Sequence, residues 1–247
     1  MLHFLIGPAG TGKTNTVRSR IADSVKKGKS GIILLTPEQY SFESERAVLR
    51  LLGATASDRA EVLSFTKLIE YVGEDCREFI GARADTGIKA VALKKALLSV
   101  NSQLHIYSKT KASPEFILSL LEIINEFKQS GIDISDLNGK IGVRNNKHLY
   151  DKIHDLELII SAYNSILAEK YLDPDDDLDR LNTALYDNHF FAGKTVYIDA
   201  FDGFTMQQYK IIEHIIKDSA DVFVSFCTDS LHDSDMGTGL FPMLKRK

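Results

Sequence analysis

The segment Gly7–Thr14 has the residues of a phosphate-binding loop. Its sequence, GPAGTGKT, fits the pattern GxxxxGK[ST] in full. Glycines in such a loop let the backbone wrap around phosphate oxygens, so that successive N–H groups point at the anion from the start of a helix. The Lys13 ammonium would reach the β- and γ-phosphates, and the Thr14 hydroxyl would coordinate Mg²⁺. We therefore expect the whole loop to bind a nucleoside triphosphate: Gly7, Pro8, Ala9, Gly10, Thr11, Gly12, Lys13 and Thr14.

A carboxylate for the Mg²⁺ shell is expected at the end of a second apolar strand. The run VYID, residues 196–199, fits this requirement, and we expect Asp199 to join Thr14 as a metal ligand through the nucleotide. Motor ATPases of the helicase type place a Glu directly after this Asp to activate water, whereas here the next residue is Ala200. Asp202 lies three residues beyond Asp199, where a turn or a helix start would point it elsewhere. The sequence therefore supports nucleotide binding better than hydrolysis, and we assign no catalytic residue.

The elements around these residues alternate between strands and helices. Short apolar runs that stop at glycine, proline or polar residues predict buried strands at residues 2–6, 31–36, 60–65, 195–199 and 221–227. Apolar residues at helical spacing predict helices at residues 13–27, 41–52, from a cap at Thr66 onward, 87–101, 114–130, 148–170, 175–187 and 205–217. Alternating strands and helices imply a parallel sheet with right-handed crossovers. We therefore expect an α/β fold, a parallel sheet flanked by helices.

The strand pattern is interrupted by about a hundred residues that show helical spacing alone. One of these helices carries a clear buried stripe, formed by Ile117, Leu120, Leu121, Ile124 and Phe127. We expect residues 1–85 and 188–230 to form the sheet domain and residues 86–187 to form an all-helical insertion. Residues 231–247 are then a tail, which we interpret as the start of a truncated continuation.

Composition and charge narrow the class of protein. The chain has 247 residues, 44% of them hydrophobic and 26% charged, which is ordinary for a globular protein. A net charge of -4 argues against holding duplex DNA mainly by phosphate neutralisation, although a local basic groove is compatible with it. The two cysteines, Cys76 and Cys227, have no metal-ligand spacing and predict reduced thiols. No segment approaches the ~20 apolar residues of a membrane span, so we expect a cytoplasmic protein without a membrane partner.

An acidic run at Asp173–Asp179 resembles a calcium-binding loop. Its sixth residue is not glycine and its twelfth is Ala184 rather than Glu, which excludes an EF-hand. Proline and carboxylates at the start of a helix explain the run better, because both are favoured in a first helical turn.

Taken together and in order, the motifs resemble one family. A P-loop at the N-terminus is followed by LLTPEQYSFESE (34–45), AEVLSFTKL (60–68), YLDPDDDLDRL (171–181) and VYIDAFDGFTMQQY (196–209). This order is similar to that of AddB/RexB, the B subunit of the bacterial ATP-dependent helicase/deoxyribonuclease that processes double-strand DNA breaks. The resemblance runs from residue 1 to about residue 230.

The resemblance implies a RecA-like fold like the first motor domain of UvrD-type superfamily 1 helicases, with the helical insertion in the same place. It also implies that LLTPEQ and SFTKL lie where such helicases touch single-stranded DNA. Five residues become candidates for this DNA path: Thr36, Gln39, Ser64, Phe65 and Thr66. Phe65 can equally well be a core residue.

The resemblance further implies ATP with Mg²⁺ as the ligand, DNA as a partner and an AddA-type helicase–nuclease subunit as a second partner. Family members carry an iron–sulfur cluster in a C-terminal nuclease domain that this chain does not include, so Cys76 and Cys227 are not assigned to it. Ala200 agrees with the tendency of this subunit to be a non-translocating, helicase-like scaffold that helps to recognise the Chi sequence during recombinational repair.

Two other classes of function remain open at this point. A small P-loop kinase should show an arginine-bearing lid, and the helical block has no close pair of arginines. A non-catalytic interaction module that keeps the P-loop as a structural turn is the other alternative.

Overall fold

The computed structural model describes residues 1–53, 57–74, 76–110, 112–140 and 146–228. The chain divides into two compact units. The sheet unit comprises residues 1–75, 181–204 and 208 onward, and the helical unit comprises residues 76–180 and 205–207. Each unit has its own hydrophobic core.

The sheet unit is built on five parallel strands in the order β1-β7-β6-β2-β3. These strands are β1 (Leu2–Gly7), β2 (Ile32–Leu35), β3 (Ala60–Leu63), β6 (Thr195–Ile198) and β7 (Asp221–Cys227). The order is not the sequence order, because β6 and β7 are inserted between β1 and β2. The expected α/β fold with a parallel sheet flanked by helices is confirmed.

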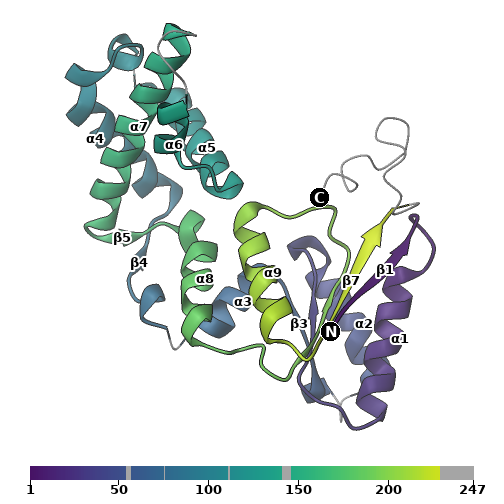
Figure 1. Cartoon of the computed structure of the whole chain (residues 1–247). Helices are drawn as coiled ribbons and strands as arrows, with labels where there is room; N and C mark the ends of the chain where they lie inside the picture. The colour runs from purple at the N-terminus through teal and green to yellow at the C-terminus, as the bar shows by residue number, and fades with distance from the viewer. Residues whose placement is uncertain (54–56, 75, 111, 141–145, 229–247) are drawn as a thin grey trace. The chain divides into compact units, whose positions relative to one another are not determined.

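Both faces of the central strands are covered, which explains why these strands read as continuous apolar runs. All four residues of β2 are buried. On one face, α1 (Lys13–Lys26) and α2 (Glu38–Leu52) pack through Val17, Ile21, Val25 and Val48 against Leu34 and Tyr197. Figure 1 shows α9 (Met206–Asp218) on the side of the sheet away from α1. The helix α3 (Phe65–Gly73) directly follows β3.

The helical unit packs four helices around one apolar core. These are α4 (Thr86–Val100), α5 (Pro114–Ser130), α6 (Ile134–Lys140) and α7 (Lys147–Ala168), and α8 (Asp177–Asp187) begins in the same unit. The predicted stripe on α5 is buried at Ile117, Leu120, Leu121 and Ile124, and Phe127 packs against it partly buried. Single-turn 3-10 helices lie at Ser57–Arg59, Arg77–Phe79, Asn101–Gln103, Tyr107–Lys109 and Pro174–Asp176.

Three expectations about local structure are wrong. The insertion is not all-helical, since β5 (Tyr171–Leu172) lies within it and pairs in parallel with β4 (Ala82–Arg83). Two-residue strands are too short to give a periodic pattern. The helix α6 was missed, because its sequence ISDLNGK has little apolar periodicity. The cap of α3 is Ser64 rather than Thr66, and the Ser64 side chain accepts a hydrogen bond from the Lys67 N–H.

A buried carboxylate anchors the loop after α4. Asp155 on α7 is fully buried, and its two oxygens accept the backbone N–H groups of His105, Ile106 and Tyr107 at 2.8, 2.7 and 3.0 Å. Three charge-assisted hydrogen bonds satisfy this carboxylate in an apolar surrounding.

Within the residues described, no helix is long and apolar enough to cross a membrane.

Candidate nucleotide site and sheet-edge cleft

The glycine-rich loop forms the turn between β1 and α1, as its sequence requires. Gly10 and Gly12 have φ angles of 79° and 84°, a left-handed conformation that glycine adopts without strain. At Gly7 the constraint is space, because an added Cβ would lie 2.7 Å from Thr11 Oγ1. The Thr11 hydroxyl donates to the Pro8 carbonyl at 2.9 Å and holds this close approach.

The start of α1 is electropositive. Gly12 is its N-cap, so no side chain caps the helix, and its first turn contains no acidic residue. The N–H groups of the first turn and the helix dipole therefore favour an anion. The Lys13 ammonium donates to the carbonyls of Gly7 and Pro8 at 2.8 and 2.7 Å, so a bound phosphate would compete with two neutral acceptors for it.

An open cleft of about 330 Å³ lies at this loop. Its lining comprises Leu5, Ile6, Gly7, Pro8, Thr11, Lys13 and Thr16. Thr14 is half-buried on the first turn of α1 and is not part of that lining among the described residues. The cleft thus combines backbone donors, a lysine and hydroxyl groups at the carboxyl end of a parallel strand, where α/β proteins bind their ligands.

A row of buried polar side chains crosses the same edge of the sheet. The strand registers place Ser225, Asp199, Thr36 and Ser64 on neighbouring strands at one level, and all four are buried. The backbone ladder continues through this row, with Asp199 N–H bonded to the Leu35 carbonyl at 3.0 Å and Thr36 N–H bonded to the Leu63 carbonyl at 2.9 Å.

Asp199 occupies the expected place at the end of β6, with β7 between it and the strand that leads into the glycine-rich loop. The Ser225 hydroxyl, on this intervening strand, donates to Asp199 Oδ1. Sequence reasoning missed Ser225, and the available signal was a hydroxyl residue inside the otherwise apolar run VFVSFC.

The residue after Asp199 has an unusual backbone. Ala200 has a φ angle of 65° and is the one non-glycine residue with positive φ among those described. A side chain in this left-handed region costs an L-amino acid about 1–2 kcal/mol. The chain therefore turns sharply at the position where a motor ATPase would carry its glutamate. The sequence did not predict this turn.

A second cleft, of about 280 Å³, opens beside Ala200. It is lined by Thr36, Pro37, Glu38, Gln39, Phe65, Ala200, Phe201, Asp202, Gly203 and Gln208. Asp202 thus lines the same cleft as Ala200. The Phe65 and Phe201 rings meet edge to face at 5.7 Å and give the cleft an aromatic wall. The Thr36 hydroxyl is buried without a hydrogen-bond partner in the described structure, so this cleft carries an unsatisfied polar atom.

The five DNA-path candidates divide into two groups. Thr36, Gln39 and Phe65 line the second cleft, although Phe65 is itself buried, as a core residue would be. Ser64 and Thr66 organise the start of α3 instead. Ser64 caps the helix, and the N–H of Thr66 donates to Glu38 Oε1 at 3.0 Å. Burial raises the pKa of Glu38, but hydrogen bonds from Thr66 and Ser64 outweigh it and hold that pKa below its usual value.

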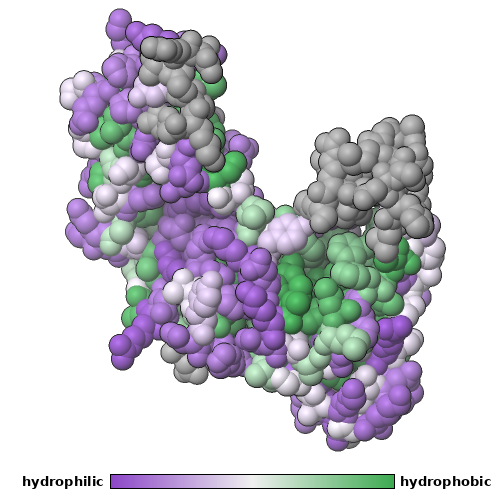
Figure 2. All heavy atoms as spheres, viewed as in Figure 1, coloured by the Kyte–Doolittle hydropathy of each residue, from purple (hydrophilic) through white to green (hydrophobic). Residues whose placement is uncertain are grey.

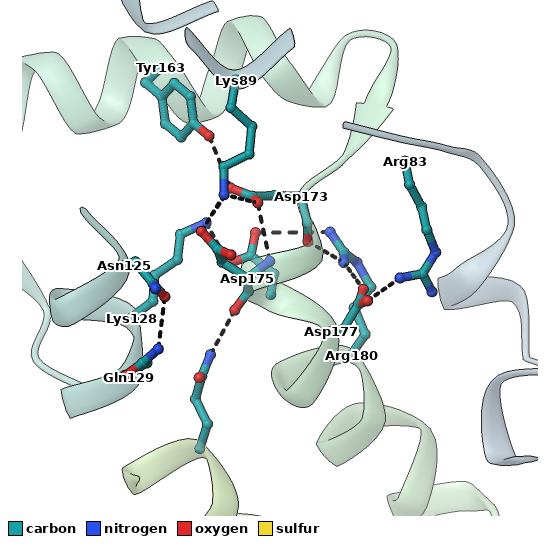
Figure 3. Close-up of polar contacts among 12 residues, drawn as sticks. Arg83, Lys89, Asn125, Lys128, Gln129, Tyr163, Asp173, Asp175, Asp177 and Arg180 are labelled. Atoms are coloured by element: carbon teal, nitrogen blue, oxygen red, sulfur yellow. Dashed lines mark hydrogen bonds and ion pairs between the residues drawn. The ribbon is translucent and has the colours of Figure 1, made fainter. Parts of the chain in front are cut away.

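The acidic run forms the polar centre of the helical unit (Figure 3). Asp173 is 4% exposed and accepts hydrogen bonds from Lys128 Nζ at 2.8 Å and Tyr163 Oη at 3.1 Å, with Lys89 Nζ 3.0 Å away. Lys89 also pairs with Asp175, and Lys128 pairs with Asp176 at 2.6 Å. This cluster ties α4, α5 and α7 to the segment that precedes α8.

The surrounding residues complete this charge network. Arg180 donates to the Asp173 carbonyl and to Asp177 Oδ1, each at 2.7 Å, and Arg83 pairs with Asp177. Burial raises the pKa of Asp173, but hydrogen bonds and charge from Lys128, with the Asp175 amide and Lys89, outweigh it and lower that pKa to about 2. The carboxylates are therefore matched by cations, and this run is a structural anchor. Arg180 is a neighbour in sequence, but Arg83, Lys89 and Lys128 come from distant parts of the chain, which is why sequence reasoning missed these three partners.

No metal centre is preformed in the described part of the chain, since it contains no group of three or more His, Cys, Asp and Glu side chains placed to hold an ion. Cys76 and Cys227 are thiols and form no disulfide.

The fold and these features define a parallel α/β protein with a glycine-rich turn between its first strand and first helix. The chain matches the family described as "ADDB, N-terminal" over residues 4–247, and it belongs to this family. The predicted resemblance to AddB/RexB is confirmed.

Similar proteins are named as the B subunit of an ATP-dependent helicase/deoxyribonuclease. The protein from Thermoanaerobacter sp. (strain X514) is 31% identical over 246 residues, which is 99% of this chain and 21% of that protein. The protein from Clostridioides difficile (strain 630) is 32% identical over 235 residues, covering 94% of this chain and 20% of that protein. The chain thus spans about a fifth of the length of these relatives.

Proposed function

We propose that the sheet unit binds ATP with Mg²⁺ through Gly7–Thr14. The observation that carries this proposal is the uncapped, positively polarised start of α1, which faces a cleft that also contains Lys13. The close approach of Thr11 to Gly7 supports it, because the loop folds back on itself there and leaves no room for a side chain at residue 7.

A magnesium ion bound with the nucleotide would be held by Thr14 and Asp199. Neighbouring strands lie about 4.8 Å apart, so β6 is about 10 Å from β1 across β7. A phosphate group with its ion could span this distance above the carboxyl end of β7. The ion would neutralise phosphate charge, while the Ser225 hydroxyl keeps Asp199 oriented.

The second cleft is proposed as part of a path for single-stranded DNA. Aromatic rings on which bases can stack, the exposed Gln39 amide and the unsatisfied Thr36 hydroxyl are the kinds of group that bind unpaired nucleotides. We assign direct contact with the DNA to the three residues that line the cleft, Thr36, Gln39 and Phe65. The other two candidates, Ser64 and Thr66, would act indirectly by holding α3 in place.

At the level of the whole protein, we propose that the chain is the N-terminal, RecA-like domain of a helicase–nuclease B subunit, resembling the first motor domain of UvrD-type helicases with a helical insertion. The name that the relatives carry supports this assignment. It would act in the cytoplasm on double-strand DNA breaks during recombinational repair, together with an AddA-type subunit. An iron–sulfur cluster would belong to a part of the protein beyond this chain.

Calorimetric titration of Mg·ATP into the chain and its Lys13→Ala variant tests nucleotide binding. A hydrogen bond to a charged group contributes about 1.5–3 kcal/mol, so affinity should fall at least about tenfold. Lys29→Ala is the matched control, because Lys29 is an exposed lysine on the loop after α1. Equal affinity in all three proteins would refute the proposal.

Fluorescence anisotropy with a single-stranded oligonucleotide tests the DNA path. We expect weak binding that falls steeply with salt, because the chain is net acidic. Gln39→Ala should weaken it, while Gln103→Ala, an exposed glutamine in the helical unit, should not. Tight binding that survives high salt, or equal loss in both variants, would count against this path.

A further inference from the structure

The first strand of the sheet has an open edge. β1 is last in the strand order and pairs with β7 on one side, with no second partner among the described residues. Proteins usually protect such an edge with charged residues or proline, because its free N–H and C=O groups recruit other strands. The first seven residues, MLHFLIG, contain neither a proline nor an Asp, Glu, Lys or Arg. This edge is therefore unprotected.

One face of the same strand is also uncovered. Leu2, Phe4 and Ile6 point to one side and are 38%, 53% and 38% exposed. Leu5 points to the other side, where it packs under α1. The Phe4 ring lies 5.6 Å from the ring of Phe226 on β7. Figure 2 shows hydrophobic residues gathered where Figure 1 has β1 and β7.

The handedness of the existing connections shows which element would cover this face. The connection from β6 through α9 to β7 moves toward β1 in the strand order, with α9 on the side away from α1. Crossovers between parallel strands are right-handed. A further connection in the same direction would therefore lay its helix over Leu2, Phe4 and Ile6, and its strand would pair with the open edge of β1.

We propose that this surface is a docking site for one helix and one parallel strand of the same polypeptide, encoded beyond residue 247. The relatives are long enough to contain such a segment, because this chain covers only 21% of the Thermoanaerobacter protein. A strand added here would satisfy the free backbone groups of β1, and the helix would bury its three apolar side chains. The proposal does not depend on nucleotide binding.

The experiment compares residues 1–247 with the natural full-length polypeptide, each with Phe4→Lys. The control is Phe42→Lys, the same change on α2 at a phenylalanine that is 76% exposed. In the 247-residue chain both variants should melt close to the parent, because more than half of each side chain is exposed and Phe4 loses only its contact with Phe226. In the full-length protein Phe4→Lys should lower the melting temperature of the sheet unit by several degrees, and Phe42→Lys should not.

Hydrogen exchange provides the second measurement. Amides of residues 1–7 should exchange at least about tenfold more slowly in the full-length protein than in the 247-residue chain, with β2 as the unchanged reference. Equal exchange in both lengths overturns the proposal, as does equal loss of stability by Phe4→Lys in both. A dimer in both lengths that Phe4→Lys dissociates would assign the surface to a second copy and also overturn it. A natural polypeptide that ends at residue 247 would do the same.

Discussion

Replacing Asp173 by asparagine removes the central charge of the network in the helical unit. The asparagine still offers an oxygen to the Asp175 N–H, which Asp173 accepts at 3.1 Å. It no longer pairs with Lys89 and Lys128, which keep Asp175 and Asp176 as partners. Removing one member of a buried ion pair costs about 3–5 kcal/mol when the other charge is left alone. Because both lysines retain a carboxylate here, we expect a smaller cost.

The lowered pKa of Asp173 gives the size of that cost. A pKa of about 2 in place of 3.8 corresponds to about 2 kcal/mol of stability at neutral pH, because each pKa unit is worth a little more than 1 kcal/mol. Since folding lowers this pKa, the contribution is present above pH 3.8 and is lost as the pH falls through about 2. The parent and Asp173→Asn should therefore differ by about 2 kcal/mol at neutral pH and by about half of that near pH 3.

Urea unfolding followed by circular dichroism at neutral pH and at several acid pH values measures this difference. Asp136→Asn is the control, because Asp136 is an exposed carboxylate on α6 of the same unit. The control should change stability by less than about 0.5 kcal/mol at every pH. A parent and an Asp173→Asn variant that unfold alike at neutral pH would refute the argument. A difference that stays constant down to pH 3 would also refute it, since it would not come from the charge.

Three other predictions follow from single positions. Ala200→Gly should raise the free energy of unfolding in urea by about 0.5 kcal/mol, and Ala200→Val should lower it by about 1 kcal/mol or more. The reason is that the backbone of residue 200 has a left-handed conformation, which glycine adopts most easily. The opposite order of stabilities would contradict this conformation. Asp155→Ala should cost about 3 kcal/mol or more in the same assay, because three buried N–H groups lose their acceptor; a loss below about 1 kcal/mol would show that water replaces the carboxylate. In a phosphate-release assay with Lys13→Ala as the blank, the chain should hydrolyse ATP barely above background. Ala200→Glu should recover little activity, because a positioned base contributes about 10²–10⁴ in rate. Motor ATPases also use an arginine finger that contributes about 10³–10⁵, and we expect none from this chain. A parent turnover of about one per second or faster would make Asp202 the first candidate for the missing base.

Local patterns in the sequence were enough to predict most of the elements. Each of these elements is recognised from residues that are close together in the sequence. Examples are the apolar run before Gly7, the helical spacing of Ile117 to Ile124 and the apolar strand around Val196. Such signals are local, because burial of one face selects the residue period. The parallel sheet then follows from the alternation of strands and helices.

The strand order could not be predicted in the same way. The sequence placed β6 and β7 after the insertion, and nothing in their residues indicates that they enter the sheet between β1 and β2. That order brings Ser225 beside Asp199. It also leaves Phe4 and its neighbours on an open edge.

The sequence by itself determined the family, the glycine-rich loop with its lysine, and the acidic residue at the end of β6, because these depend on residue type at fixed spacing. The tertiary structure alone decided that Thr36, Gln39 and Phe65 share a cleft while Ser64 caps a helix, and that Lys89 and Lys128 neutralise Asp173. The physical reason is distance along the chain. Lys89 lies more than eighty residues before Asp173, and the charge of one is balanced by the other after the helices have packed.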